Sequence, residues 1–235
     1  MSATEAQGPF FFTYCNLKCI FCQNYDISHA GNGHEVSDRQ LANIMLELQA
    51  MGCHNINLVS PSHVVPQILS ALEFAIPDGL SIPLVYNTGG YDRVETLGLL
   101  HDVIDIYMPD FKFWNSDAAL KMCAAADYPQ IARRAIVEMH RQVGDLQCGS
   151  DGLAKRGLLI RHLVLPGGLS GTRQILQFIA EKISLNSYVN LMSQYRPCGQ
   201  ATEMDELTEP ISASDFRAAI KIAHENGIHR LDRPG

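Results

Sequence analysis

The sequence has few positive charges and no long apolar run. Its 235 residues include 18 Lys and Arg against 25 Asp and Glu, so the basic stripe that nucleic-acid binding requires is missing. No apolar segment approaches the roughly 20 residues that cross a bilayer, and the start of the chain lacks the charged and apolar regions of a signal peptide. These absences predict a cytoplasmic protein that binds neither nucleic acid nor membranes.

Internal repeats, low-complexity segments and linker-like stretches are missing as well. Hydrophobic residues make up 46% of the chain and charged residues 18%, which leaves ample apolar material for a core. A chain of this length suits one large domain. We therefore predict a single domain over residues 1–235, with a flexible tail at 1–8 and a surface loop at 149–157.

Short apolar runs alternate with amphipathic stretches along the whole chain. Between the runs, apolar residues recur at helical spacing, with a capping box at Ser37 and Gln40, Pro66 in a first turn and a break at Tyr128-Pro129. Several runs are apolar on consecutive residues, as in parallel strands covered on both faces. The runs cover residues 10–14, 56–60, 83–86, 103–108, 158–165 and 188–192.

The pattern gives about six βα units, fewer than the eight of a closed TIM barrel. It predicts an α/β fold of parallel strands with outer helices, either doubly wound or curled into a partial, TIM-like (β/α)6 barrel. In both arrangements, ligands bind at the carboxyl ends of the strands.

Three of the seven cysteines, Cys15, Cys19 and Cys22, lie close together just after the first predicted strand. A structural zinc site takes four ligands, often as two paired knuckles, and no second knuckle follows. Three thiolates on a 4Fe–4S cluster leave one iron open to another ligand. We interpret these cysteines as ligands of such a cluster. A zinc site completed by a distant His and a chance grouping are the alternatives.

The Cys-x3-Cys-x2-Cys spacing, with Phe21 before the third cysteine, resembles the signature of the radical S-adenosylmethionine superfamily. Other segments resemble the branch that contains pyruvate formate-lyase activating enzyme, and an uncharacterised subgroup named after that enzyme. Residues 22–24, 110–112 and 160–167 carry the resemblance to the branch, and residues 60–63, 86–92 and 193–197 carry the resemblance to the subgroup.

The resemblance implies two cofactors, a 4Fe–4S cluster and S-adenosylmethionine. It implies reductive cleavage of S-adenosylmethionine to a 5′-deoxyadenosyl radical that abstracts hydrogen from a substrate. A reducing partner of the flavodoxin or ferredoxin type would supply the electron. The substrate is either a glycyl-radical protein, as for an activase, or a small molecule or peptide. A non-catalytic iron–sulfur relative is the alternative from another class.

The resemblance also implies the residues that contact the cofactor. Arg161 is interpreted as a carboxylate or ribose contact, because a guanidinium matches a carboxylate well; its alternative is an ion pair with Asp105 or Asp110. Ser62 has the alternative role of a helix N-cap. The full predicted set is Phe21, Asn24, Ser60, Ser62, Asn87, Asp110, Lys112, Arg161, Leu163 and Gln194.

Three further features stay open. Asn87, Thr88, Met108 and Asp110 align with a monovalent-cation site, but Asn87 stands where a carboxylate is usual, and this weakens a site for a hard cation. Cys198 is either a packed loop cysteine or a thiol near the substrate, in an acidic loop over residues 198–210 that is expected to wall the mouth of the site. His63 either faces the substrate or is a polar loop residue.

Overall fold

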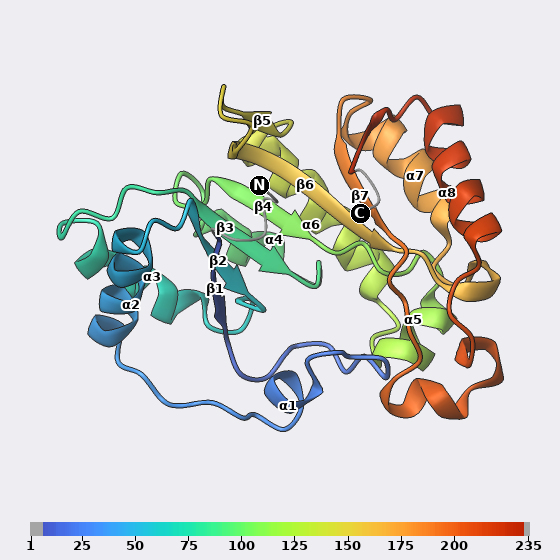
Figure 1. The fold of residues 1–235 in the computed structure, drawn as a ribbon, viewed down its shortest axis with the longest axis horizontal. Helices are drawn as coiled ribbons and strands as arrows, with labels where there is room; N and C mark the ends of the chain where they lie inside the picture. The colour runs from blue at the N-terminus through green and yellow to red at the C-terminus, as the bar shows by residue number, and fades with distance from the viewer. Residues whose placement is uncertain (1–6, 233–235) are drawn as a thin grey trace.

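A mostly parallel sheet runs through the molecule (Figure 1), and the computed structural model describes it over residues 7–232. Seven strands follow the order β1-β2-β3-β4-β6-β7-β8, with every neighbouring pair parallel, and β5 pairs antiparallel with β6. The strands are β1 (Gln7–Phe11), β2 (Asn55–Val59), β3 (Leu84–Thr88), β4 (Ile106–Pro109), β5 (Gln147–Cys148), β6 (Ala154–Leu163), β7 (Tyr188–Met192) and β8 (Arg230–Leu231).

The helices begin and end where the sequence provides the expected signals. Ser37 and Gln40 form the predicted capping box before α2, and Pro66 lies in the first turn of α3. Ala124 ends α5 in the left-handed conformation, and α6 starts at Tyr128. The helices are α1 (Tyr25–Ser28), α2 (Asp38–Ala50), α3 (Val65–Ala75), α4 (Val94–Gly98), α5 (Ser116–Cys123), α6 (Tyr128–Val143), α7 (Thr172–Phe178) and α8 (Ala213–Glu225).

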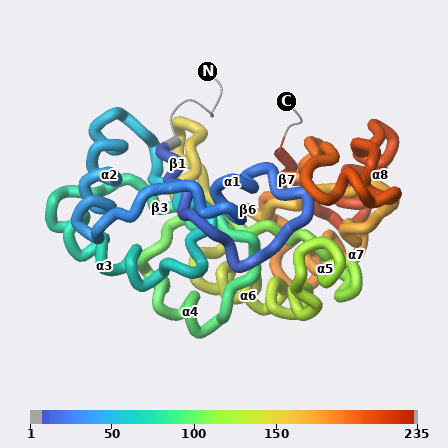
Figure 2. The backbone as a smooth tube through the Cα atoms, turned by 90° about the horizontal axis from the view of Figure 1, so that it is seen from below, coloured from blue at the N-terminus to red at the C-terminus, as the bar shows by residue number. Residues whose placement is uncertain are grey.

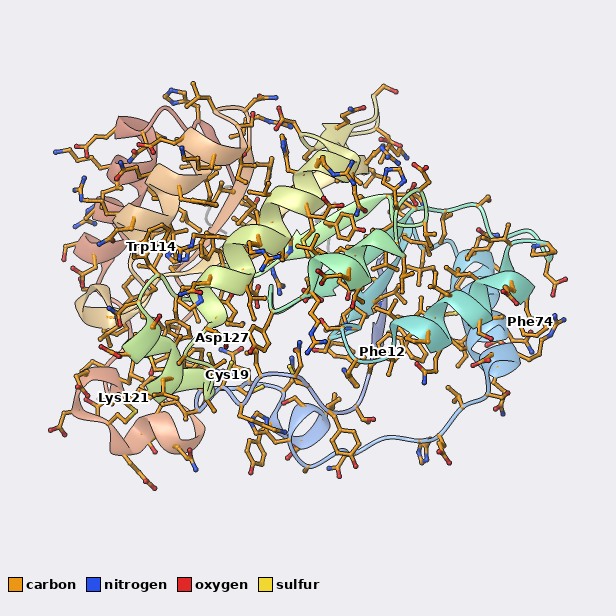
Figure 3. The ribbon with its side chains drawn as sticks, turned by 180° about the vertical axis from the view of Figure 1, so that it is seen from behind. Phe12, Cys19, Phe74, Trp114, Lys121 and Asp127 are labelled. Carbon is orange, nitrogen blue, oxygen red and sulfur yellow. The ribbon has the colours of Figure 1, made fainter. Side chains whose placement is uncertain are left out.

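The helices pack on the outside of the sheet. Helices α2 and α3 lie at the β1–β3 side, and α7 and α8 lie at the β7 side (Figure 1), while α4 and α6 cover the middle of the sheet when the molecule is seen from behind (Figure 3). The sheet does not close, because β1 and β8 are its two ends. The predicted partial barrel of parallel strands with outer helices is confirmed.

Strand β1 forms one free edge of the sheet among the described residues. It pairs with β2 only, in a register that places Pro9 opposite Asn57. Helix α2 packs on α3 and contacts β1 and β2, so this end of the sheet is covered on its outer face but open along its edge.

The segment before β6 differs from the prediction. A surface loop was expected over residues 149–157, but a tight turn closes from Gly149 to Gly152, and β6 begins at Ala154. Gly157 has φ +122°, and a Cβ atom there would lie 2.5 Å from the Asp145 carbonyl oxygen. This close approach of two backbone segments requires glycine. Gly157 therefore lies within β6 and allows the strand to pass close to Asp145.

Of the predicted tail at residues 1–8, residues 1–6 lie outside the described part, and Gln7 and Gly8 belong to β1. That portion of the prediction is wrong, because both residues pair with β2. The single domain over 1–235 stays a prediction. Within residues 7–232, no helix has the length and apolarity that a bilayer crossing demands.

Candidate functional site

A cavity of about 280 Å³ opens at the carboxyl ends of the strands. One wall is the segment that follows β1, residues 12–24, which we call the cluster loop. Figure 2, drawn from the side of the strand ends, shows this segment crossing in front of them. All the predicted site residues line the cavity except Ser62: Cys15, Cys19, Phe21, Cys22, Asn24, Ser60, Asn87, Asp110, Lys112, Arg161, Leu163 and Gln194.

The cluster loop is irregular, and its backbone is tied to the end of α5. The amide of Lys18 donates to the Cys123 carbonyl at 3.2 Å, and the amide of Ile20 donates to the Met122 carbonyl at 3.0 Å. These carbonyls lie in the last turn of a helix, where they have no partner within the helix. Figure 3 shows Cys19, which lies between the two donors, beside α5.

Two apolar side chains anchor the cluster loop in the core. Leu17 is buried, and the ring of Phe21 lies edge-on to Phe113 at 6.2 Å and to Tyr195 at 6.0 Å. Leu17 and Phe21 stand between the cysteines in sequence, and both line the cavity together with Cys15, Cys19 and Cys22. Phe21 therefore both anchors the loop and lines the site.

Cys15 and Cys19 are thiols whose surroundings oppose a free negative charge. Burial raises the pKa of Cys15. A hydrogen bond with Cys123, together with burial, raises the pKa of Cys19 well above its usual value. A metal must displace these protons when it binds. Soft thiolates select iron–sulfur clusters, zinc or copper(I), so the donor set fits a cluster held by Cys15, Cys19 and Cys22.

Opposite the cysteines, one carboxylate faces two cations. The Asp110 carboxylate lies 2.5 Å from Lys112 Nζ and 2.7 Å from Arg161 Nη2. Burial alone would raise the pKa of Asp110, but Arg161 and Lys112 outweigh it and hold that pKa below its ordinary value. Burial likewise opposes the charge on Lys112, yet Asp110 raises the pKa of Lys112. The group carries one positive charge in excess, which attracts an anionic ligand.

The sequence analysis gave an ion pair with Asp105 or Asp110 as the alternative role of Arg161, and the ion pair with Asp110 is present. Asp105 is not the partner; its carboxylate accepts from the Leu84 amide at 2.9 Å. The pair does not use the whole guanidinium, because Arg161 Nε is buried without a hydrogen-bond partner in the part of the chain that the structure describes. A buried donor of this kind is costly unless a ligand satisfies it. This atom and the excess charge fit the methionine carboxylate of S-adenosylmethionine.

A third group of polar side chains lies at the end of β3. The Asp92 carboxylate accepts from Tyr86 Oη at 2.9 Å and from Thr88 Oγ1 at 2.6 Å, and Ser62 Oγ lies 3.0 Å from Thr88 Oγ1. Burial raises the pKa of Asp92, against the lowering effect of these hydroxyls. Ser62 therefore supports Thr88 from behind the cavity rather than lining it. A role for Ser62 as N-cap is wrong, since Val64 occupies that position without a side-chain bond.

Tyr128 connects the ends of β3 and β4. Its buried hydroxyl oxygen accepts from the Lys112 amide at 2.9 Å. The same hydroxyl donates toward the carbonyl oxygens of Gly89 and Asp110, which lie 2.9 Å and 2.8 Å from Tyr128 Oη. Gly90 fits beside it with φ +79°, where a Cβ atom would lie 2.2 Å from the Asp110 carbonyl oxygen. We call Thr88–Asp92 together with Asp110, Lys112 and Arg161 the strand-end wall.

The structure places Cys198, His63 and the loop 198–210, whose roles the sequence left undecided. Cys198 Sγ donates to the Phe21 carbonyl at 3.3 Å, so it contacts the cluster loop from behind and does not line the cavity. His63 Nε2 lies 2.8 Å from the Thr13 carbonyl and does not line the cavity either. In the loop 198–210, Tyr195 Oη donates to the Leu207 carbonyl at 2.8 Å, and Lys121 pairs with Glu206 at 3.0 Å.

The contacts of Asp110 and Thr88 disfavour a monovalent cation at the position suggested by the resemblance. Asp110 already faces Lys112 and Arg161, and the Thr88 hydroxyl donates its proton to Asp92. Two cations beside the same carboxylate disfavour a third.

Sequence reasoning missed Asp92, Ser28 and His29. Asp92 was part of a motif that resembled the family, but nothing in the sequence shows that a charge two residues after Gly90 turns inward. Ser28, at the end of α1, and His29, which follows it, line the cavity. This helix is too short to give an amphipathic pattern.

Comparisons with known proteins identify the family of this chain. The sequence model of the Radical SAM superfamily matches residues 10–146, which include the three cysteines and most of the strand-end wall. The chain is 30% identical over 225 residues to the uncharacterized protein MJ0674 of Methanocaldococcus jannaschii, covering 93% of this chain and 62% of that protein. The chain belongs to the radical SAM superfamily.

Two solved structures show the same fold. The FeFe-hydrogenase maturase HydG matches with TM-score 0.64 and 15% identity, over 96% of this chain and 50% of HydG. A domain of pyruvate-formate lyase-activating enzyme from Bacteroides vulgatus matches with TM-score 0.51 and 14% identity, over 74% of this chain and 94% of that domain. The superfamily uses a 4Fe–4S cluster and S-adenosylmethionine, so both predicted cofactors are confirmed.

Proposed function

We propose that this chain binds a 4Fe–4S cluster through Cys15, Cys19 and Cys22 and cleaves S-adenosylmethionine reductively at that cluster. The observation that carries the proposal is that the three cysteines and the group of Asp110, Lys112 and Arg161 line one and the same cavity. When bound, the two cofactors supply the electron and the 5′-deoxyadenosyl radical that abstracts hydrogen from a substrate. The protein contributes binding, orientation and exclusion of water.

The residues of the cavity divide this work. Arg161 and Lys112 attract the methionine carboxylate, and Asp110 fixes the direction of both cations. Asn87 and Ser60 provide polar atoms beside the strand ends, and Gln194 does so from the opposite side after β7. Leu163 and Phe21 supply apolar surface, and Asn24 closes the cavity from the cluster loop.

For the substrate, we propose a protein or peptide, with a glycyl-radical protein as the activase hypothesis. Tyr14 and Tyr25, which flank the cysteines in sequence, are 56% and 55% exposed. Exposed aromatic residues beside a site are typical of protein interfaces. A small-molecule substrate remains the alternative. The electron would come from a flavodoxin- or ferredoxin-type partner.

The test is anaerobic reconstitution followed by reduction in the presence of S-adenosylmethionine. The protein should take up about four irons per chain, and 5′-deoxyadenosine and methionine should form in equal amounts. Cys19→Ala should abolish both cluster uptake and cleavage, whereas Cys53→Ala should change neither. A stable cluster without any cleavage would indicate a non-catalytic iron–sulfur relative. Tight binding of one zinc, with no uptake of iron, would contradict the proposal.

A further inference from the structure

The hydroxyl of Ser28 lies between a cluster cysteine and a histidine. Ser28 Oγ is 3.0 Å from Cys22 Sγ and 2.8 Å from His29 Nδ1. Ser28 is only 6% exposed, and all three residues line the cavity. Neither Ser28 nor His29 has a part in the reaction proposed above.

The chemistry of the three groups fixes the direction of both hydrogen bonds. A cysteine that ligates iron is a thiolate, so its sulfur has no proton and can only accept. The single proton of the Ser28 hydroxyl must then point at Cys22. The Ser28 oxygen is left to accept from His29, and this requires the ring proton to be on Nδ1. Both the neutral Nδ1–H tautomer and the charged imidazolium meet this requirement.

The short helix α1 holds this arrangement in place. The amide of Ser28 donates to the Asn24 carbonyl and the amide of His29 donates to the Tyr25 carbonyl, both at 2.8 Å. The His29 ring also stacks on the ring of Tyr25, with centroids 4.7 Å apart and an angle of 15°. Backbone and ring contacts therefore determine where Ser28 and His29 lie.

Cys22 differs in this respect from the other two cysteines. Cys15 Sγ accepts from the Leu17 amide at 3.5 Å, and Cys19 faces the thiol of Cys123. Within residues 7–232, a hydroxyl contacts the sulfur of Cys22 and of neither other cluster cysteine.

We propose that Ser28 donates a hydrogen bond to the Cys22 sulfur in the cluster-bound protein, that His29 is its positioning residue, and that this bond raises the reduction potential of the cluster. It does so because a donor to a cluster sulfur stabilises the more negative, reduced state. The proposal rests on the cluster site proposed above. It adds that Ser28 makes reduction of the cluster by the electron donor easier.

The test compares reduction potentials, measured by anaerobic redox titration and followed by the electron resonance signal of the reduced cluster. Ser28→Ala should lower the potential, and Ser28→Thr, which keeps the hydroxyl, should restore it toward the native value. His29→Phe keeps a ring on Tyr25 but removes the nitrogen, and it should shift the potential in the same direction by a smaller amount. The double variant Ser28→Ala/His29→Phe should match Ser28→Ala, because His29 acts through Ser28.

Ser187→Ala is the matched control. Ser187 is 2% exposed, its hydroxyl has no hydrogen-bond partner among the described residues, and it precedes β7 at the end of the strand opposite the cavity. Equal potentials for Ser28→Ala and Ser187→Ala, at equal iron content, would overturn the proposal. If Ser28→Ala does not retain a cluster, the reduction potential of His29→Phe becomes the test. A potential of His29→Phe equal to that of the unmodified protein would then overturn the proposal. Failure of the unmodified protein to bind iron would instead refute the proposed function.

Discussion

The strand-end wall and the cluster loop face the same cavity, but they are held in place differently. Side chains hold the strand-end wall: Asp92 binds two hydroxyls, Asp110 faces two cations, and Tyr128 joins the ends of two strands. The cluster loop is held mainly through its own backbone: two of its amides donate to carbonyls of α5, and the carbonyls of Thr13 and Phe21 lie within hydrogen-bond distance of His63 and Cys198. Burial of Leu17 and Phe21 adds to this. From this comparison we predict that the strand-end wall is preformed, whereas the cluster loop becomes rigid only when it holds a metal.

The strongest test of the preformed wall is Gly90→Ala. The new Cβ atom would lie 2.2 Å from the Asp110 carbonyl oxygen at φ +79°, so β3 and β4 must separate. We expect a loss of at least about 3 kcal/mol in the free energy of unfolding, measured by denaturant titration. Gly79→Ala is the control, since Gly79 has φ +101° but nothing within 4 Å, and it should cost about 1–2 kcal/mol. Equal losses for the two variants would show that the wall tolerates movement.

Arg161→Ala tests the recognition function of the same wall. The variant should retain the cluster but bind S-adenosylmethionine about 1.5–3 kcal/mol more weakly, as expected for a lost charge-assisted contact. Equilibrium binding to the reconstituted protein, with the electron resonance spectrum as a check on the cluster, measures this. If affinity is unchanged and only the melting temperature drops, Arg161 serves the ion pair with Asp110 alone.

Removal of the cluster tests the other half of the comparison. In the protein without iron, amides of the cluster loop, including Lys18 and Ile20, should exchange with solvent at least about ten-fold faster than in the reconstituted protein, which corresponds to about 1.4 kcal/mol. The amides of Gly90 and Lys112, which belong to the strand-end wall, should change little. Equal protection of both regions in the two forms would mean that the loop is as preformed as the wall.

Cys198→Ser should have the smallest effect. Cys198 donates to the Phe21 carbonyl at 3.3 Å, and serine can replace this bond, so cleavage of S-adenosylmethionine should stay within about 1 kcal/mol of native in activation free energy. Alkylation of the intact reconstituted protein, mapped by mass spectrometry, supplies the second measurement. Burial raises the pKa of the Cys198 thiol, so it should react more slowly than exposed Cys148. Rapid labelling would place Cys198 at the open mouth instead.

The parts of this structure that sequence could predict are those with local or periodic signals. The longer strands and the capping box at Ser37 follow from neighbouring residues alone, and the three cysteines stand out by spacing. The bounds were less exact: the first strand was predicted at 10–14 but is Gln7–Phe11, and the helix break predicted at Tyr128-Pro129 covers residues 124–127. β5 and β8 were missed because strands of two residues carry no period. They form only because a longer partner strand passes beside them.

The parts that the sequence could not predict are contacts between distant segments, because residue spacing gives no information about them. Lys18 meets Cys123 and Tyr128 meets Gly89 because the fold brings them together. Ser62 illustrates the limit: its place after β2 was correct, but the sequence could not show that its hydroxyl turns to Thr88 and away from the cavity.

The edge that β1 leaves unpaired among the described residues bears on strand pairing between copies of the chain. An unpaired edge strand is a template for strand pairing with a second copy. The amide of Phe12 donates to β2, at the Val59 carbonyl, and since donors alternate along a strand, residue 9 faces away from β2, toward the open edge. That residue is Pro9, which has no N–H to offer. An incoming chain would therefore find a gap in the middle of the row of donors, and this disfavours growth of the sheet beyond β1, where the barrel fails to close.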